Sequence, residues 1–429
     1  MASLDFFASA WDFLAALPGG AFIGLFWLTL FAEVPRYFLG VQATAAALMV
    51  GGDRASPPLD PRKVPKVSIL LVGHNEEDSI EKCVHSLREQ TFTAFEIVCV
   101  DDGSTDRTFA VMSRLRRERL VHSAVRIELR GGKPSGINLA ARLATGDIFV
   151  VIDCDCSFEA DAIEELLRPI VEDRTVTAVS GNILVRNWRR SVVASLQGIE
   201  YLMSISLGKS YADALDQVCC VSGAYGAFRR DAWEHINGMD AGGGEDFDFT
   251  MRLRLAGYRV VFVRHSICYT DVPHTLYTLL RQRNRWDRDT FALRLRKFKH
   301  LYNPFGARFF WRDLIHQWDF LLFNLLPTIV FPFYLTWLLT RYGELGTLLL
   351  VAVMLALFVL DIAVFACAVL VTGRPIYWRL LPFLPLFGPF QSFVMRSQRF
   401  YAYTSEWIFS LSRQDNYTPQ KTRDWLVWK

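Results

Sequence analysis

Residues 150–157 read V-V-I-D-C-D-C-S, and this stretch decides which fold we expect. Four apolar residues, 149–152, lead directly into Asp153 and Asp155. A continuous apolar run is typical of a buried parallel strand, and ligands of open α/β sheets bind just beyond the carboxyl ends of such strands. Residues two apart on a strand point to the same face, so both carboxylates should face one crevice.

This pair of carboxylates predicts a divalent metal site. Two close carboxylates repel each other unless a cation lies between them, and Mg²⁺ or Mn²⁺ bound in this way usually completes its shell with phosphate oxygens of a substrate. A D-x-D pattern alone is weak, because a solvated turn after a strand has the same sequence. The remaining motifs must therefore decide between the two interpretations.

The composition indicates a membrane protein with a cytosolic domain. Of 429 residues, 52% are hydrophobic, which is too many for an ordinary soluble domain with 21% charged residues. The excess lies at the two ends of the chain. A net charge of +3 is too small to indicate a nucleic acid partner. The eight cysteines form no C-x-x-C pair, and most lie in apolar runs, which indicates reduced thiols in a cytosolic core.

Residues 1–52 are expected to form an N-terminal membrane anchor. Within them, 16–32 can span a bilayer, whereas 37–50 is shorter and fits either an interfacial helix or part of a longer tilted span. A signal peptide is the competing interpretation, but the first 20 residues contain no Lys or Arg.

Residues 53–66 form a polar, proline-rich linker with four basic residues. By the positive-inside rule this side is the cytoplasm, so we expect a multi-pass protein of the cell inner (plasma) membrane.

Residues 67–273 alternate between strand and helix patterns, which predicts an α/β domain with a parallel sheet. The expected strands are 67–72, 95–100, 125–129, 147–152 and 175–182, with a further buried strand and small-residue turn at 218–223. The expected helices are 79–90, 107–118, 137–145, 160–171, 187–209 and 247–256. Polar residues follow several of these strands, so their side chains should converge on one crevice.

A second acidic pair, Glu245 and Asp246, follows three consecutive glycines, 242–244. Glycines permit close approach to a ligand, and they lead here into the start of a helix. Carboxylates at a helix start also serve as simple caps, so both interpretations stay open at this point.

Residues 274–316 are expected to form amphipathic helices at the membrane interface, because basic and aromatic residues are interleaved there. The arginines after Arg288 are expected to bind lipid headgroups.

Residues 317–411 are expected to form the C-terminal transmembrane region, with spans at 320–340 and 345–371. Residues 412–429 are expected to form a polar tail. A third segment, 380–395, contains three prolines and could span, bend or re-enter. Asp361 lies inside the second span and should face the bundle.

Taken together, these motifs resemble the family 2 inverting glycosyltransferases of membrane-embedded polysaccharide synthases. The matching features are Asn75-Glu76, Asp101-Asp102-Gly103-Ser104, Gly132-Lys133 with Asn138, Asp153-x-Asp155, Glu245-Asp246 and Gln282-Arg283-x-Arg285-Trp286. The Q-x-x-R-W pattern after an E-D pair is specific. Residues 221–230 look most like poly-N-acetylglucosamine synthases, with chitin-oligosaccharide and hyaluronan synthases close behind. The resemblance implies a GT-A (Rossmann-like) α/β domain with a mostly parallel sheet, flanked by transmembrane helices.

The resemblance also implies roles for individual residues. Asp155 would hold Mg²⁺ or Mn²⁺, with Asp153 close to the metal or the ribose, and Asp246 would be the general base beside Glu245. The other residues implied to bind the nucleotide sugar are His74, Asn75, Glu76, Asp101, Asp102, Lys133 and Arg285. Those implied to bind the acceptor are Ser222, Gly223, Gln282, Arg283 and Trp286.

Three stretches depart from the family pattern. Gly244 stands where many relatives have Thr, so this loop could set the acceptor register differently. Residues 73–75 lack the aromatic residue that relatives commonly place near His74. Residues 224–227 differ from the Gly-Pro of chitin and hyaluronan synthases, which weakens any inference about their acceptor preference.

The expected function is a processive inverting glycosyltransferase that polymerises a β-linked polysaccharide from UDP-GlcNAc or UDP-glucose. So few spans favour an accessory membrane subunit or a homo-oligomer for secretion of the glycan. The alternative is a non-processive transferase that adds one sugar to a lipid acceptor such as ceramide, diacylglycerol or polyprenyl phosphate. A third interpretation, a non-catalytic sensor, is disfavoured because each expected catalytic position holds a residue that can perform the chemistry.

Overall fold

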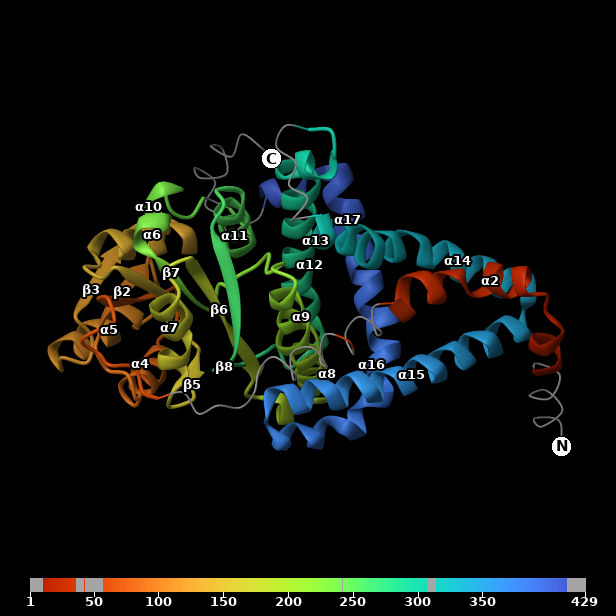
Figure 1. The fold of residues 1–429 in the computed structure, drawn as a ribbon, viewed down its shortest axis with the longest axis horizontal. Helices are drawn as coiled ribbons and strands as arrows, with labels where there is room; N and C mark the ends of the chain where they lie inside the picture. Colours follow the sequence, from red (N-terminus) through yellow and green to blue (C-terminus); the bar gives the residue numbers. More distant parts are fainter. Residues whose placement is uncertain (1–10, 36–41, 43–56, 241, 307–313, 415–429) are drawn as a thin grey trace.

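The computed structural model describes residues 11–35, 42, 57–240, 242–306 and 314–414. An α/β body that contains the sheet lies at one end of the molecule, and long helices extend from it at the other (Figure 1). The helix that joins the two regions, α12 (Leu276–Ala292), packs most extensively against α17 (Arg396–Phe409). The motifs that the sequence analysis identified lie in the α/β body and on α12.

The sheet has eight strands in the order β3-β2-β1-β4-β7-β6-β8-β5. Their bounds are β1 (Val67–Gly73), β2 (Phe95–Asp102), β3 (Ser123–Ile127), β4 (Ile148–Asp153), β5 (Ser157–Phe158), β6 (Val176–Val185), β7 (Tyr225–Arg229) and β8 (Arg259–Thr270). Strands β3, β2, β1 and β4 are parallel, as are β6 and β8, whereas β7 runs antiparallel to both β4 and β6 and β5 runs antiparallel to β8. The predicted α/β class is therefore confirmed, and the sheet is mixed.

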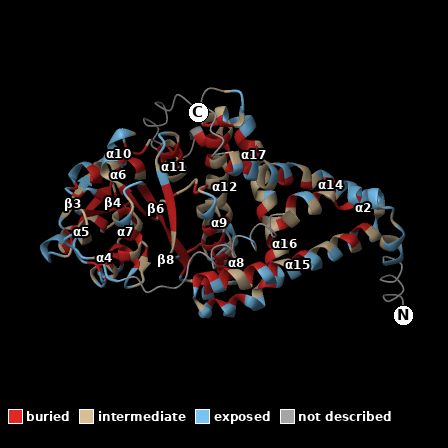
Figure 2. Cartoon of the chain, viewed as in Figure 1, coloured by how far each residue is buried: buried red, intermediate tan, exposed pale blue. Residues whose placement is uncertain are grey.

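Both faces of the sheet are buried because alternate residues of each strand enter different cores. On β4, Val150 and Ile152 pack with α4 (Ile80–Arg88), α5 (Thr108–Arg117) and α7 (Ala162–Glu172). Phe149 and Val151 pack with α6 (Lys133–Leu143) and α11 (Glu245–Leu255) on the other face. Figure 2 shows the strands as the most continuously buried part of the molecule. This double burial explains why the strands read as uninterrupted apolar runs.

The helices of the α/β body agree largely with the expected ones. They are α4 (Ile80–Arg88), α5 (Thr108–Arg117), α6 (Lys133–Leu143), α7 (Ala162–Glu172), α8 (Val192–Tyr201), η3 (Leu202–Leu207), α9 (Gly208–Ala214), α10 (Arg230–His235) and α11 (Glu245–Leu255). Helix α6 begins at Lys133 and not at residue 137, because Gly132 adopts a φ of 85° and Pro134 fits the first helical turn. Strand β8 and helix α10 were not predicted.

The strand predicted within 218–223 is wrong. The N–H of Val221 donates to Thr250 Oγ1 at 2.9 Å, and the N–H of Ser222 lies 3.5 Å from Ser180 Oγ. These backbone groups bond to side chains and not to a neighbouring strand, so the segment is an irregular loop. The strand that does form here, β7, begins at Tyr225.

Two helical segments, Leu314–Tyr342 and Glu344–Thr372, are long and apolar enough to cross a membrane. They contain α13 (Leu314–Asp319), α14 (Leu326–Tyr342) and α15 (Glu344–Thr372), and they match the predicted spans 320–340 and 345–371. Large apolar side chains such as Leu355 and Val359 of α15 are 61% and 64% exposed. Asp361 is fully buried and lies beside Gly388, so it faces the helix bundle as expected.

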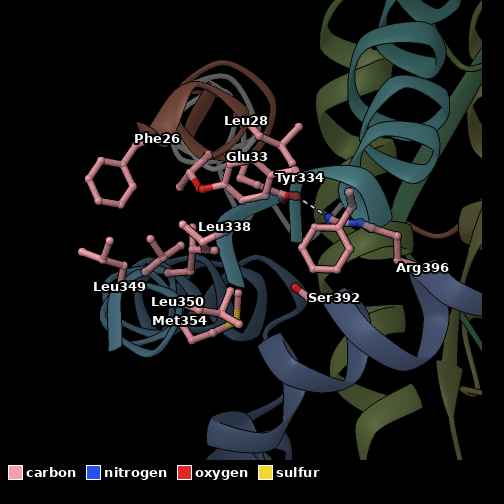
Figure 3. Close-up of a pocket in the computed structure, with 14 residues that line it drawn as sticks. Phe26, Leu28, Glu33, Tyr334, Leu338, Leu349, Leu350, Met354, Ser392 and Arg396 are labelled. Carbon is pink, nitrogen blue, oxygen red and sulfur yellow. Dashed lines mark hydrogen bonds and ion pairs between the residues drawn. The ribbon is translucent and has the colours of Figure 1, made fainter. Parts of the chain in front are cut away.

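The apolar helix near the N-terminus, residues 19–33, is shorter than these two. It comprises α2 (Gly19–Leu28) and a π-helical turn, and it packs against α14 and α15 around a small hollow (Figure 3). At the edge of this hollow Glu33 pairs with Arg396 at the start of α17 (Arg396–Phe409). Of the second predicted N-terminal segment, 37–50, the structure describes residue 42 alone.

The proline-rich segment 380–395 is helical but irregular. A 3₁₀ helix, Pro375–Phe383, leads into α16 (Leu384–Pro389) and a π-helical stretch, Phe390–Met395. Within the described ranges it is not among the segments long and apolar enough to cross a membrane. This irregular helical geometry is explained by the prolines, because proline removes a helical hydrogen bond.

Arg294, Arg296 and Lys297, which follow α12 (Leu276–Ala292), have protein partners, which corrects the expectation that the arginines after Arg288 bind lipid headgroups. Arg294 stacks against Phe247 and Phe320, and Arg296 forms a 2.9 Å ion pair with the fully buried Glu406 of α17. Lys297 lies 2.5 Å from Asp248 of α11. These residues therefore join the α/β body to the helices at the other end of the molecule.

Candidate active site

A cavity of about 1550 Å³ opens beside the carboxyl ends of β1 and β4. Its walls come from the start of α6, the 219–224 loop, the start of α11, the α8–η3 region and α12. Of the predicted site residues it is lined by His74, Glu76, Asp102, Lys133, Asp153, Asp155, Ser222, Gly223, Glu245, Asp246, Gln282, Arg283, Arg285 and Trp286. Motifs that are more than two hundred residues apart in the chain thus surround one space.

Lys133 joins two of the acidic motifs. Its amino group lies 2.5 Å from Asp153 Oδ1 and 3.8 Å from Glu245 Oε1, and it also donates to the Gly223 carbonyl at 3.2 Å. Burial alone would lower the pKa of Lys133, but the charges of Asp153 and Glu245 outweigh it and the pKa is raised. The lysine therefore stays protonated and places a fixed positive charge in the cavity.

The negative charge of Asp155 is less well compensated by protein groups than that of Asp153. The Asp155 carboxylate contacts the Thr270 hydroxyl at 3.4 Å and the Cys156 thiol at 3.6 Å, and both contacts are long. Burial and the neighbouring charge of Asp153 raise the pKa of Asp155. Burial also raises the pKa of Glu76, and the charges of Asp155 and Asp153 add to this effect. Negative charge is therefore concentrated on this wall of the cavity.

The second acidic pair forms the first turn of α11. Asp246 Oδ2 accepts a hydrogen bond from the Gly223 N–H at 3.2 Å, and its Oδ1 lies 2.7 Å from the Phe247 nitrogen. Glu245 lies deeper, and burial raises the pKa of its carboxyl group, which the charge of Lys133 opposes. These two contacts hold the partly buried Asp246 in place at the wall of the cavity.

The glycines before this pair allow α12 to approach α11 closely. Gly244 has a φ of 69°, and a Cβ atom on it would lie 2.6 Å from Leu293. A Cβ atom on Gly243 would lie 2.1 Å from the carboxylate of Asp289 on α12. A larger residue at either position would therefore force the Asp289 or Leu293 side chain to move. This contact is a physical reason for the glycine run that departs from the family pattern.

The residues after β1 and β2 divide between the cavity and the interior. His74 Nδ1 lies 2.9 Å from the Asp102 carbonyl, and the Asp102 carboxylate accepts the N–H groups of Gly131 and Gly132 at 2.7 and 2.9 Å. Asp102 therefore fixes the glycine turn that leads into Lys133.

Asn75 and Asp101 do not line the cavity. Asn75 adopts a φ of 61°, and its side-chain oxygen accepts the N–H of Thr105 at 2.9 Å. Asp101 is fully buried; one oxygen accepts the Ser104 N–H at 3.1 Å and the other lies 3.5 Å from Arg126 Nε. Asn138, part of the family pattern, does line the cavity, and its side chain holds the backbone of Met239 through two hydrogen bonds.

Sequence reasoning missed the partner of the Q-x-x-R-W motif on α12. The guanidinium of Arg283 forms two 3.0 Å contacts with the two carboxylate oxygens of Glu200 on α8, and it lies 4.8 Å above the ring of Trp286. Glu200 also lines the cavity. Nothing in the sequence marks it, because it lies inside an apolar helix more than eighty residues away.

The carboxylates fit a divalent cation only if the substrate supplies further ligands. Asp153 and Asp155 offer the oxygen ligands that Mg²⁺ and Mn²⁺ prefer, and Asp155 carries a charge that the protein compensates poorly. Among the described residues no group of three or more His, Cys, Asp or Glu side chains could hold a metal by itself. This arrangement agrees with a metal that is shared with the phosphates of a ligand.

Comparison with known proteins agrees with this geometry. Residues 68–236 match the family model described as glycosyl transferase family 2. The chain is 27% identical over 243 residues to a poly-beta-1,6-N-acetyl-D-glucosamine synthase of Staphylococcus aureus, and 23% identical over 278 residues to that of Staphylococcus epidermidis. These matches cover 56% and 65% of this chain, and they span 58% and 65% of the length of the relatives.

A solved structure shares the fold over most of the chain. It is the mannosyltransferase PcManGT from Pyrobaculum calidifontis, in complex with GDP-Man and Mn²⁺, with a TM-score of 0.57 and 21% sequence identity. The similarity covers 82% of this chain and 99% of the other. At this level of identity the similarity establishes a common GT-A-like fold.

Proposed function

Since this chain is a glycosyltransferase with a family 2 domain at residues 68–236, we propose that it polymerises a β-linked polysaccharide from a nucleotide sugar. The observation that carries the proposal is the position of Asp246. Its carboxylate is held by the Gly223 N–H, beside the Lys133–Asp153 pair, on the wall of the same cavity. A base and a phosphate-binding charge that line one space can hold an acceptor hydroxyl and a diphosphate near the same sugar carbon.

The proposed reaction is a single displacement. Asp246 takes the proton of an acceptor hydroxyl as its oxygen forms a bond to the anomeric carbon, and general base assistance of this kind contributes about 10²- to 10⁴-fold. The bond from that carbon to the diphosphate breaks, and the nucleoside diphosphate leaves with the electron pair. Because attack occurs opposite the leaving group, an α-linked donor gives a β-glycoside.

Positive charge on the donor side stabilises the leaving group. Lys133 is fixed between Asp153 and Glu245, and Arg285 on α12 lines the same cavity. Mg²⁺ or Mn²⁺ held by Asp155 and Asp153 would supply further charge neutralisation for the diphosphate. His74, Glu76 and Asp102 line the cavity on the nucleotide side.

Acceptor binding is assigned to Trp286 and to the residues around Asp246. Trp286 offers an aromatic face, and Arg283 with Glu200 fixes the orientation of that ring. Ser222 and Gly223 lie beside Asp246, and Gln282 extends the same wall. The names of the relatives make UDP-GlcNAc the first donor to test, followed by UDP-glucose.

The proposed setting is the cytoplasmic face of the cell inner membrane. The domain at 67–273 would lie in the cytosol and the helices at 274–316 at the membrane interface, with 317–411 and the N-terminal anchor at 1–52 in the bilayer. The exposed apolar side chains of α14 and α15 support this arrangement. An accessory membrane subunit or a homo-oligomer would complete the path for the glycan.

A single transfer to a lipid is the second candidate. Helix α12 carries the Q-x-x-R-W residues, and it is tied to α17 by Asp287 with Arg399 at 3.6 Å. The acceptor side of the cavity therefore adjoins the helices of the proposed membrane region, where a lipid hydroxyl could enter.

Product size separates the two candidates. The purified, detergent-solubilised protein would be incubated with Mg²⁺ or Mn²⁺ and a panel of radiolabelled UDP- and GDP-sugars, with and without added lipid acceptors. High-molecular-weight material from one donor supports the polysaccharide synthase. A single labelled lipid supports the second candidate instead.

A further inference from the structure

A buried lysine lies behind the acceptor wall of the cavity. The amino group of Lys209 on α9 lies 2.5 Å from Ser222 Oγ and 3.0 Å from Ser180 Oγ. Ser180 is fully buried, so the charged end of the lysine is inside the protein. In the part of the chain that the structure describes, no carboxylate forms an ion pair with Lys209. Because an unpaired ammonium group is costly to bury, its presence here calls for a local function.

The hydrogen bonds of Lys209 determine the direction in which each of the two serine hydroxyls donates. A lysine ammonium group has three donors and no acceptor, so both serine oxygens accept from it. The hydroxyl of Ser180 then donates to the Gly181 carbonyl at 3.3 Å. For Ser222, no described protein group accepts the hydroxyl proton. That proton is therefore available to an oxygen atom of a ligand.

Ser222 is placed where such a ligand would react. It lines the cavity, and the next residue, Gly223, donates its N–H to Asp246 at 3.2 Å. Gly223 is also the residue whose carbonyl accepts from Lys133. Ser222 is therefore the residue next to Gly223, which contacts both the proposed base, Asp246, and the donor-side lysine, Lys133.

We propose that Lys209 is a positioning residue for the acceptor: it holds Ser222 Oγ as an acceptor and so directs the Ser222 O–H to an oxygen of the acceptor sugar beside Asp246. This inference rests on the proposed function and adds a residue that does not itself touch the substrate. It concerns the hydroxyl-bearing acceptor and not the nucleotide sugar.

The charge state of Lys209 gives the inference a pH signature. Burial lowers the pKa of Lys209, while the charge of Asp246 near it acts in the opposite direction. On rising pH Lys209 loses its proton earlier than an exposed lysine would. A neutral amine can accept the Ser222 proton, which would turn the hydroxyl away from the ligand.

The test compares Lys209→Met, Lys209→Arg and Ser222→Ala with the wild type, using UDP-GlcNAc as donor and soluble N-acetylglucosamine oligosaccharides as acceptors. Lys209→Met and Ser222→Ala should each raise the acceptor KM by about tenfold and change the donor KM by less than about twofold. The double variant should be no worse than either single variant, because both remove the same hydrogen bond. Lys209→Arg should retain acceptor binding and extend activity to higher pH.

Lys82→Met is the matched control, since Lys82 is an exposed lysine on α4. Independent, additive losses in the double variant, or equal losses of donor and acceptor binding in Lys209→Met, would overturn the inference. Thermal unfolding of each variant separates loss of folding from loss of acceptor binding. Wild-type protein that turns over no nucleotide sugar would instead refute the proposed function, and with it this inference.

Discussion

The amino group of Lys133 lies 2.5 Å from Asp153, and so connects the first residue of α6 to the last residue of β4. The same lysine is 3.8 Å from Glu245 at the start of α11. One positive charge is therefore shared by the two acidic motifs of the cavity. A ligand with a diphosphate group could bind to this charge without a large rearrangement of the protein.

Lys133→Gln should weaken binding of the nucleotide sugar. The variant removes the fixed charge and leaves Asp153 without its closest cation, so we expect the donor KM to rise by at least about tenfold. Initial rates at varied UDP-sugar concentration measure this effect, with Lys82→Gln as an exposed control. An unchanged donor KM would show that Lys133 serves only to balance the carboxylates.

Asp155→Asn should remove the dependence of nucleotide binding on metal. Asp155 is the less compensated of the two carboxylates, and an amide of the same shape binds a divalent cation far more weakly. Titration calorimetry of UDP with and without Mn²⁺ checks the prediction. Asp147→Asn is the control, because Asp147 is exposed and lies at the opposite end of β4. The same gain in affinity on adding Mn²⁺ to Asp155→Asn and to wild type would rule out this metal site.

Trp286→Ala should impair acceptor use more than donor use. Loss of a stacking face costs about 1 kcal/mol or more, so the acceptor KM should rise several-fold and polymeric products should shorten. Glu200→Gln should produce a smaller change in the same direction, because it frees Arg283 but keeps the ring. Kinetics with oligosaccharide acceptors compare the two variants. A larger loss in Glu200→Gln than in Trp286→Ala would contradict the assigned roles.

Asp213→Asn should stabilise the protein at neutral pH. Burial raises the pKa of Asp213 to about 6, above its ordinary value of 3.8, although its carboxylate accepts the Phe262 N–H at 2.8 Å. Between these pH values the folded protein holds a proton that the unfolded chain has lost, so stability falls as pH rises through this window. The asparagine keeps an acceptor and removes this cost, on the order of 1 kcal/mol after solvent screening.

Thermal unfolding in detergent tests this at two pH values. The gain in Tm of Asp213→Asn over wild type should be larger near pH 7.5 than near pH 5, because above about pH 6 the wild-type carboxylate is charged. Equal gains at both pH values would mean that the carboxyl group titrates alike in the folded and unfolded chains.

The sequence predicts well those parts of the site that follow buried strands. The run into Asp153 is recognisable because a strand buried on both faces is continuously apolar, and its carboxyl end must lie at the sheet edge. The acidic pair after three glycines is recognisable for a similar reason, since glycines and a helix start have local signatures.

The features that could not be predicted depend on contacts between distant segments. Glu200 pairs with Arg283, which lies 83 positions away in the sequence. Lys209 on α9 donates a hydrogen bond to Ser180 on β6. The loop at 218–223 looks like a strand because Val218 and Val221 are apolar and buried, but its N–H groups bond to side chains of other elements. Such partners leave no periodic pattern in the sequence.

The replacement Asp246→Asn tests the central claim most directly, because it leaves an oxygen to accept the Gly223 N–H and removes only the basicity of the group. The measurement is kcat for sugar transfer together with the Kd for the UDP-sugar. We predict that kcat falls by about 10²- to 10⁴-fold while donor affinity stays close to that of wild type and of the Asp147→Asn control. Transfer by Asp246→Asn at close to the wild-type rate would contradict the assignment of the base, and with it the proposed mechanism.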